Sequence, residues 1–130
     1  MRANIIIKAK QNGATIEGIN IRGDFVETDT AYLFSYLEST NDNLIVLDKV
    51  TKSITVEKLS TLPRENYHSK LIFDLNKTNK CGIEVDEYMT FVDVKTTKME
   101  INKTNEYMSI LLEYYIADAF NEIEIIADWS

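Results

Sequence analysis

Few residues of this chain have types and spacings that could carry out chemistry. His68 is the single histidine, and Cys81, thirteen positions later, is the single cysteine. No serine or cysteine is spaced from His68 as a recognisable nucleophile partner, and no second cysteine or histidine completes a zinc site with Cys81. We therefore interpret His68 as an ordinary strand residue. We expect a protein that is not an enzyme and holds no metal ion or cofactor.

The chain has two pairs of carboxylates in which the two members are two positions apart. Glu84 with Asp86, and Glu122 with Glu124, would each lie on one side of a strand, because side chains alternate between the two faces. Paired carboxylates serve glycoside hydrolysis when they stand roughly 5–10 Å apart across a cleft. A solvated strand face has the same pattern, with apolar neighbours such as Val85 turned to the other face. We favour this second interpretation.

Aromatic residues form a more informative set. Tyr32, Phe34 and Tyr36 share one side of one predicted strand, and we expect Tyr114 to join them from across the molecule. Tyrosine combines an apolar ring with a polar tip, which suits a ligand pocket that has a few placed hydrogen bonds. The same residues suit a packed core whose hydroxyl groups are satisfied near the rim.

Two charged residues are candidates for the polar end of such a site. We expect Glu38 and Lys58 at the rim, beside the tyrosines. Lys58 could meet an anionic end of a ligand, or it could be a surface lysine on the polar side of its strand. The four glycines of the chain form no phosphate-binding pattern.

These candidates lie on runs that alternate apolar and polar side chains along the whole chain. Ile19, Ile21 and Phe25 form one such set, and Ile110 and Leu112 begin another. A period of two predicts half-buried β-strands, and many short runs with brief turns predict a sandwich or a closed barrel. The predicted strands are 4–10, 15–27, 31–39, 44–50, 53–60, 67–75, 82–88, 90–102, 107–118 and 120–128, with polar turns at 28–30, 41–43, 76–80 and 103–105.

All predicted connections are short. Asn12-Gly13 is a strong hairpin signal, Thr51-Lys52 could form a two-residue turn, and a loop surrounds Pro63, the only proline. Gly18 and Gly23 predict bends or a bulge in the long second strand. Parallel strands need crossovers of about a dozen residues or more, so we predict an antiparallel meander, either closed or stacked as two sheets.

One segment has a second interpretation. Thr104 could cap a helix that carries Met108, Leu111 and Tyr115 at helical spacing. The same segment alternates without interruption from Met108 to Ile116, and its β-branched and aromatic residues favour a strand. We predict a strand here.

The net charge of −7 is unevenly distributed. Residues 1–65 carry 8 basic and 9 acidic side chains, whereas residues 66–130 carry 6 and 12. Nucleic acids and anionic membranes bind through Lys and Arg, so we expect neither as a partner.

The first ten residues hold no secretory signal and one cysteine allows no internal disulfide, so we expect a cytoplasmic protein. No linker or repeat divides residues 1–130, so we expect one domain, as a monomer or a homodimer.

Several strings, in order and over nearly the whole chain, resemble a known family. They are Arg22-Gly23-Asp24-Phe25, Ala31-Tyr32-Leu33 continuing to Tyr36 and Glu38, Val92-Asp93-Val94-Lys95-Thr96 continuing to Met99 and Ile101, and the closing set Ile110, Leu112, Tyr114, Asn121, Ile123 and Ile125. This pattern is similar to the YwiB-like family of small bacterial proteins, which belongs with the calycin, or lipocalin-like, barrels. The chain departs from the family at Lys58 and Ser60, where an arginine and a glycine are usual, and at Thr90, where a glycine is usual.

The resemblance implies an all-β fold, an up-and-down meander closed into a calycin-like barrel of about 8–10 strands. It implies no catalytic residues. Calycin barrels typically bind small apolar molecules inside the barrel, although a fold does not by itself confer a function.

Two hypotheses about function follow. The first is a binding protein that holds a small apolar or amphipathic ligand in the barrel interior, lined by Tyr32, Phe34, Tyr36 and Tyr114. The second is a protein-interaction module with a filled barrel, in which the acidic C-terminal half or an exposed strand edge meets a partner.

Overall fold

The computed structural model describes residues 1–60 and 66–129 and contains a closed barrel of antiparallel strands. Each strand pairs with its neighbours in sequence, and β1 pairs with β10 to close the barrel. The strands are β1 (Arg2–Gln11), β2 (Ala14–Glu27), β3 (Ala31–Glu38), β4 (Asn41–Asp48), β5 (Ile54–Ser60), β6 (Tyr67–Phe73), β7 (Thr78–Val85), β8 (Tyr88–Lys103), β9 (Tyr107–Ile116) and β10 (Ala119–Asp128). The predicted all-β, up-and-down barrel is confirmed. The described part of the chain has no helix that could cross a membrane.

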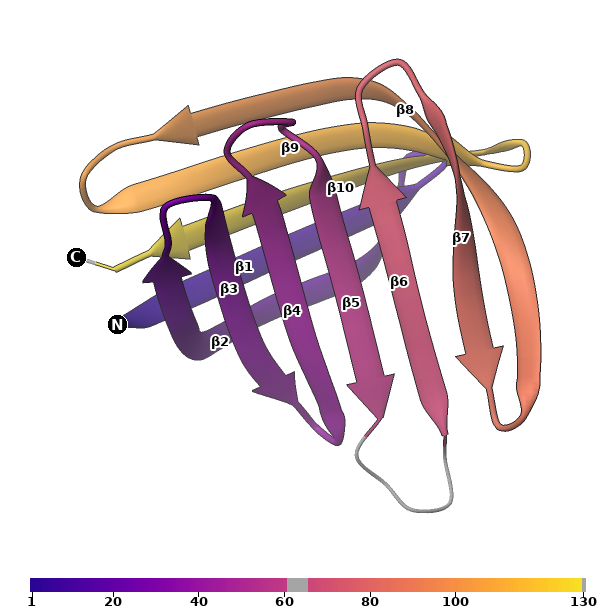
Figure 1. Cartoon of the computed structure of the whole chain (residues 1–130), viewed down its shortest axis with the longest axis horizontal. Helices are drawn as coiled ribbons and strands as arrows, with labels where there is room; N and C mark the ends of the chain where they lie inside the picture. The colour runs from indigo at the N-terminus through magenta and orange to yellow at the C-terminus, as the bar shows by residue number, and fades with distance from the viewer. Residues whose placement is uncertain (61–65, 130) are drawn as a thin grey trace.

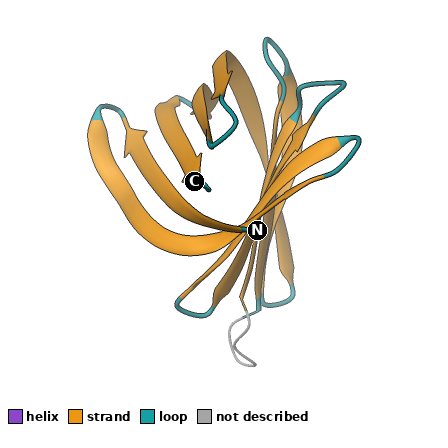
Figure 2. Ribbon diagram, turned by 90° about the vertical axis from the view of Figure 1, so that its left-hand side faces the viewer, coloured by secondary structure: helices purple, strands orange, loops and turns teal. Residues whose placement is uncertain are grey.

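The barrel consists of two layers whose strands run crosswise. Strands β3 to β7 lie side by side, and β8, β9, β10 and β1 pass behind them in Figure 1. Figure 2 shows the strands curving around a common interior, with loops at both ends. The long strands β2 and β8 join the layers. β2 pairs with β1 through residues 14–24 and with β3 through residues 24–27, and β8 changes partner from β7 to β9 near Val94.

Strand β9 shows how the alternation builds the core. Met108, Ile110, Leu112 and Tyr114 are buried in the interior, and the residues between them are half-buried on the outer side. The helical interpretation of this segment is wrong, because the hydroxyl oxygen of Thr104 accepts the N–H groups of residues 106 and 107 in a turn that leads directly into the strand. The predicted strand is confirmed.

Several turns lie where the sequence predicts them and others do not. Asn12 and Gly13 form a two-residue hairpin with φ values of 49° and 84°, as type I′ turns require. The predicted turn at 41–43 is wrong, because the chain turns at Ser39-Thr40, with φ of 53° at Ser39, and Asn43 is part of β4. The predicted turn at 76–80 is shorter than expected, since β7 begins at Thr78.

The predicted two-residue turn at Thr51-Lys52 is also wrong. Residues 49–53 form a longer loop, held by the Asp48 carboxylate, which accepts the N–H groups of Val50 and Thr51 at 2.8 and 2.9 Å. These two bonds hold the pKa of Asp48 below its usual value. The loop predicted around Pro63 lies outside the described residues.

The predicted bend in β2 is present, but the bulge has a different place. The register between β1 and β2 shifts at Ala9 and Lys10, which leaves Ile16 as the extra residue. Gly23 instead permits a close approach. A Cβ atom built on Gly23 would collide with the backbone oxygen of Ser35 in β3 and would lie 2.7 Å from Cδ1 of Ile5. A side chain at Gly23 would therefore prevent β2 from crossing between the layers.

Along part of the boundary between β6 and β7, side-chain hydrogen bonds take the place of backbone hydrogen bonds. The two strands pair only through residues 67–70 and 82–85. Beyond that point the N–H of Ile72 donates to Sγ of Cys81 at 3.3 Å, and Nδ2 of Asn79 donates to the carbonyl of Ile72 at 3.1 Å. The same amide of Asn79 donates to Asp74 at 2.8 Å.

We expect Asn79→Ala to lower the free energy of unfolding by about 1–2 kcal/mol, because it removes two hydrogen bonds and leaves the Ile72 carbonyl unpaired. Urea denaturation measures the change. Asn102→Ala, at an exposed strand position, is the matched control and should change stability by less than about 0.5 kcal/mol. Equal stabilities of the two variants would show that the Asn79 side chain does not hold the seam.

Candidate functional site

The β2–β3 seam opens into a cleft. The two strands pair only through Asp24–Glu27 and Tyr32–Ser35, so the preceding part of β2 pairs only with β1 and the end of β3 pairs only with β4. The gap forms a solvent-open cleft of about 680 Å³. Its apolar walls and its inner polar side chains come from four strands and include Ile21, Tyr36, Leu37, Asn43, Leu44 and Leu59.

Asn43 carries an unpaired acceptor at this cleft. Its side chain is only 3% exposed, and its Nδ2 donates to the carbonyl of Asn41 at 3.1 Å. Its Oδ1 has no hydrogen-bond partner. Among the described residues, the hydroxyl oxygen of Thr96 is the only other buried side-chain atom in this state, and Thr96 does not line the cleft. Because an unpaired buried acceptor is costly by about 1–3 kcal/mol, Asn43 needs an explanation other than stability.

Asn121 provides a comparison within the same molecule. Its Nδ2 donates to the carbonyl two residues earlier, in Ala119, at 3.0 Å, which repeats the local geometry of Asn43. Asn121 is 6% exposed, and its Oδ1 is not among the unpaired buried atoms. The local bond is therefore not the feature that distinguishes Asn43. The distinguishing feature is the free oxygen beside a cleft.

Tyr36 stands next to Asn43, because the two residues pair directly across β3 and β4. Burial, and then the negative charges of Glu17 and Glu38, raise the pKa of the Tyr36 hydroxyl above its ordinary value. Burial and the charge of Glu17 raise the pKa of Tyr114 as well. Both tyrosines therefore keep their protons near neutral pH and present neutral hydroxyl groups close to Glu17.

The predicted aromatic residues do not form a single site. Phe34 is fully buried in the core, with its ring centroid 5.1 Å from that of Phe25. Tyr114 is buried and its ring packs edge-on against Phe73 at 4.7 Å. Of the four predicted aromatic residues, only Tyr36 lines the cleft.

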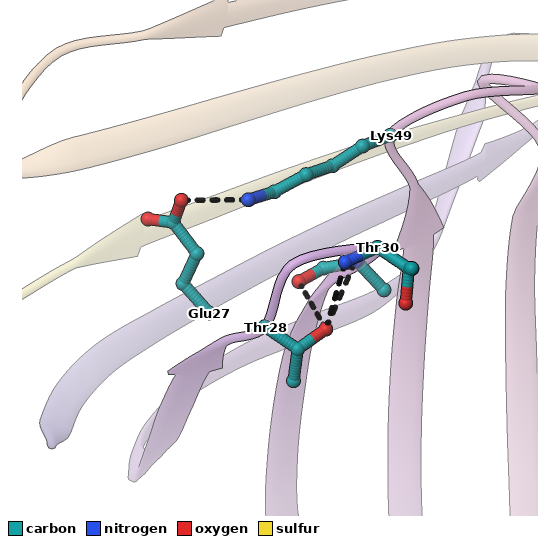
Figure 3. Close-up of polar contacts among 5 residues, drawn as sticks. Glu27, Thr28, Thr30 and Lys49 are labelled. Atoms are coloured by element: carbon teal, nitrogen blue, oxygen red, sulfur yellow. Dashed lines mark hydrogen bonds and ion pairs between the residues drawn. The ribbon is translucent and has the colours of Figure 1, made fainter.

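Tyr32 lies at the other end of β3, where cations surround its ring. The ammonium groups of Lys49 and Lys103 lie 4.7 and 5.6 Å from the ring centroid. Figure 3 shows Lys49 reaching Glu27, at 2.7 Å, above the turn in which the Thr28 oxygen accepts backbone N–H groups. The bond to Lys49 holds the pKa of Glu27 below its ordinary value. These contacts join the two layers at one end of the barrel.

Glu38 and Lys58 are both half-buried. Lys58 pairs directly with Asn43 across β4 and β5, so it shares the inner side of the barrel wall with Asn43. Glu38 pairs with Asn41 at the end of β3, close enough to Tyr36 to affect its pKa. The structure therefore brings Tyr36, Glu38 and Lys58 to the same end of the barrel and leaves Tyr32 at the other.

Sequence reasoning missed Asn43 and Glu17. Asn43 follows Asn41 and Asp42, and such a polar run is typical of a turn. Glu17 carried a usable signal, because it lies in phase with Ile19 and Ile21 and so falls on the apolar side of its strand.

The remaining candidates lie on the outer surface or in turns. Nε2 of His68 lies 2.9 Å from Oε2 of Glu57, and both side chains are partly exposed. The expectation that Glu84 and Asp86 share a strand face is wrong, because Asp86 lies in the β7–β8 turn with φ of 55°. Val85, expected on the covered face, is 49% exposed at this hairpin tip.

The second carboxylate pair lies on a strand face as expected. Glu122 pairs with Lys10, and Glu124 pairs with Lys8, across β10 and β1. Such cross-strand pairs of opposite charge are typical of a solvated sheet face. Within residues 1–60 and 66–129, no three His, Cys, Asp or Glu side chains are grouped so that they could hold a metal ion.

The fold and the site define a closed antiparallel β-barrel protein with a cleft in its wall. The chain belongs to the family described as "Domain of unknown function (DUF1934)", whose model matches residues 3–123. The structure is similar to the crystal structure of the ywiB protein from Bacillus subtilis, with a TM-score of 0.73 at 11% sequence identity, over 99% of this chain and 90% of that chain. The predicted YwiB-like relationship is confirmed. The search of curated proteins found no match.

Proposed function

We propose that this protein binds a small amphipathic ligand in the cleft between β2 and β3. The observation that carries the proposal is the unpaired Oδ1 of Asn43, which is buried at the inner wall of the cleft. A ligand group that donates a hydrogen bond would satisfy this oxygen. The cleft volume of about 680 Å³ is within the range of small-molecule sites.

The walls indicate the chemistry of the ligand. Its polar group donates a hydrogen bond to Asn43, and its apolar part lies against Ile21, Leu37 and Leu59. The charged side chains that line the cleft are Arg2, Arg22, Asp24, Asp42 and Glu57, and Glu17 and Glu38 lie close enough to neighbouring Tyr36 to raise its pKa. A neutral or cationic donor fits this surplus of carboxylates better than an anion. A site of this kind differs from the one that the sequence suggests, in which Lys58 would bind an anionic end of the ligand.

The proposal is a binding protein without catalysis, located in the cytoplasm. The single cysteine is buried and unpaired, which suits a reducing compartment. Calycin barrels hold small molecules in the central interior. Here the interior beside Phe34 and Leu112 is filled by fully buried side chains, so we place the ligand in the wall cleft instead.

Native mass spectrometry of protein purified from its own host tests this proposal. We expect a non-covalent small molecule on the wild type and about 5- to 150-fold weaker binding, seen as lower occupancy, on Asn43→Leu, because the lost hydrogen bond is worth about 1–3 kcal/mol. Asn121→Leu is the matched control and should retain the molecule, since Asn121 does not line the cleft. Bare polypeptide in all three samples, or equal occupancy in all three, would contradict the proposal.

A further inference from the structure

One backbone edge of β2 is open where the strand lines the cleft. The N–H of Phe25 donates to the carbonyl of Met1 at 2.8 Å, and the amino group of Met1 donates to the carbonyl of Phe25 at 2.9 Å, so Phe25 faces β1. Successive residues of a strand direct their backbone groups to opposite sides, so the N–H and C=O groups of Arg22 and Asn20 face away from β1. β3 does not pair with them, because it pairs with β2 only through residues 24–27. In Figure 1 the earlier part of β2 bends away from β3 and continues behind it.

The facing end of β3 is open in the same way. The carbonyl of Ala31 accepts the N–H of Thr28, the residue that follows β2, at 2.9 Å, so the odd-numbered residues of β3 face β2. Leu37 is one of these residues, but pairing between β2 and β3 ends at Ser35. The cleft therefore lies between two strand edges whose backbone donors and acceptors have no partner strand.

The open edge of β2 lacks the features that commonly block a free strand edge. Such edges usually carry proline, lysine or a bulge. Residues 18–23 contain neither proline nor lysine, and the bulge at Ile16 lies before them. The guanidinium of Arg22 lies 3.3 Å from Oδ1 of Asn4, on the side of β1. At a rise of about 3.3 Å per residue, Gly18 to Arg22 provides about 13 Å of free edge, enough for a strand of about four or five residues.

We propose that the ligand of the cleft is a short free peptide that adds a strand to β2. This inference rests on the proposed function and names the chemical class of its ligand. The peptide backbone exchanges hydrogen bonds with Arg22 and Asn20, as in other cases of strand addition. Its side chains alternate between the inner wall, with Ile21 and Asn43, and the outer wall, with Leu37. One side chain on the inner side donates to Oδ1 of Asn43.

Tandem mass spectrometry of the molecule released from the wild-type protein, purified from its own host, tests the chemical class. We expect fragments whose mass differences equal those of amino-acid residues, from a peptide of about three to six residues. A bound molecule without peptide bonds would overturn this inference and leave the proposed function standing. Bare polypeptide would contradict both, and a dimer without a small molecule would show instead that the open edge pairs with a second copy.

Asn20→Pro tests the open edge itself. The substitution removes an N–H that faces the cleft side and takes no part in the bonds to β1, and proline is tolerated at such edge positions. We expect about tenfold weaker binding of the released peptide, measured by calorimetry. Asn20→Ala, which keeps the N–H at the same exposed position, is the matched control and should bind as the wild type does. Equal binding by the two folded variants would overturn the proposal.

Amide hydrogen exchange followed by NMR tests the same pairing without a substitution. The protein as isolated is compared with protein freed of its ligand by unfolding in urea, dialysis and refolding. We expect the ligand to slow exchange at Asn20 and Arg22 at least about tenfold more than at Ile19 and Ile21, whose N–H groups face β1. An equal change at both kinds of position, or no change at either, would overturn the proposal.

Discussion

Gly23→Val is expected to lower the free energy of unfolding by about 3 kcal/mol or more. The branched side chain would collide with the Ser35 backbone oxygen and with Cδ1 of Ile5, at the point where β2 crosses from one layer to the other. Overpacking of a side chain costs about 1–3 kcal/mol, and here a backbone atom also blocks the space, so β2 must move away from β3. Urea denaturation followed by circular dichroism measures the change.

Gly18→Val is the matched control, because Gly18 lies in the same strand and a Cβ built there meets no atom within 4 Å. It should leave stability within about 0.5 kcal/mol of the wild type, or raise it slightly, since valine favours strands. If the two valine variants are equally stable, the close approach of β2 and β3 at Gly23 is not a constraint on the fold.

Phe34→Ala has the other large expected effect, a loss of about 3–5 kcal/mol in the free energy of unfolding. Phe34 is fully buried, and its ring stacks on Phe25, which in turn stacks on Trp129 at 4.1 Å. Truncation removes this contact and leaves a cavity where the two layers meet. The single tryptophan supplies a second signal, because its fluorescence should change when the neighbouring ring is released.

Leu37→Ala, on the outer side of the same strand and 56% exposed, is the control and should cost less than about 1 kcal/mol. A Phe34→Ala protein that unfolds at the wild-type urea concentration would mean that Phe34 is not part of the packed core. In that case the aromatic residues of β3 would again be candidates for lining an interior ligand cavity.

Local patterns were sufficient to predict the barrel. The alternation from Met108 to Ile116 outweighed a helical spacing, and Asn12-Gly13 placed its hairpin correctly. The alternation of apolar and polar side chains shows which face of a strand is covered, and it can be identified from a few consecutive residues. Turn positions were less predictable, because Ser39 and Lys52 both adopt positive φ without being glycine or asparagine.

The candidate site was only partly predictable, because a cleft depends on where two ladders end. Pairing between β2 and β3 stops at Asp24 and Ser35, and no run of residues signals that point. Tyr36 was predicted from its place on the apolar face. The polar run that contains Asn43 predicts a turn, and the importance of Asn43 depends on an oxygen whose lack of a partner only a three-dimensional structure reveals.

A high-resolution crystal structure of the wild-type protein purified from its own host tests the central claim most directly. We predict electron density for a small molecule in the β2–β3 cleft, with a donor atom within about 3.2 Å of Asn43 Oδ1 and apolar atoms against Ile21 and Leu59. A cleft that contains only water bound to Asn43, or one that β3 closes by pairing with β2 beyond Asp24, would contradict the proposed binding function.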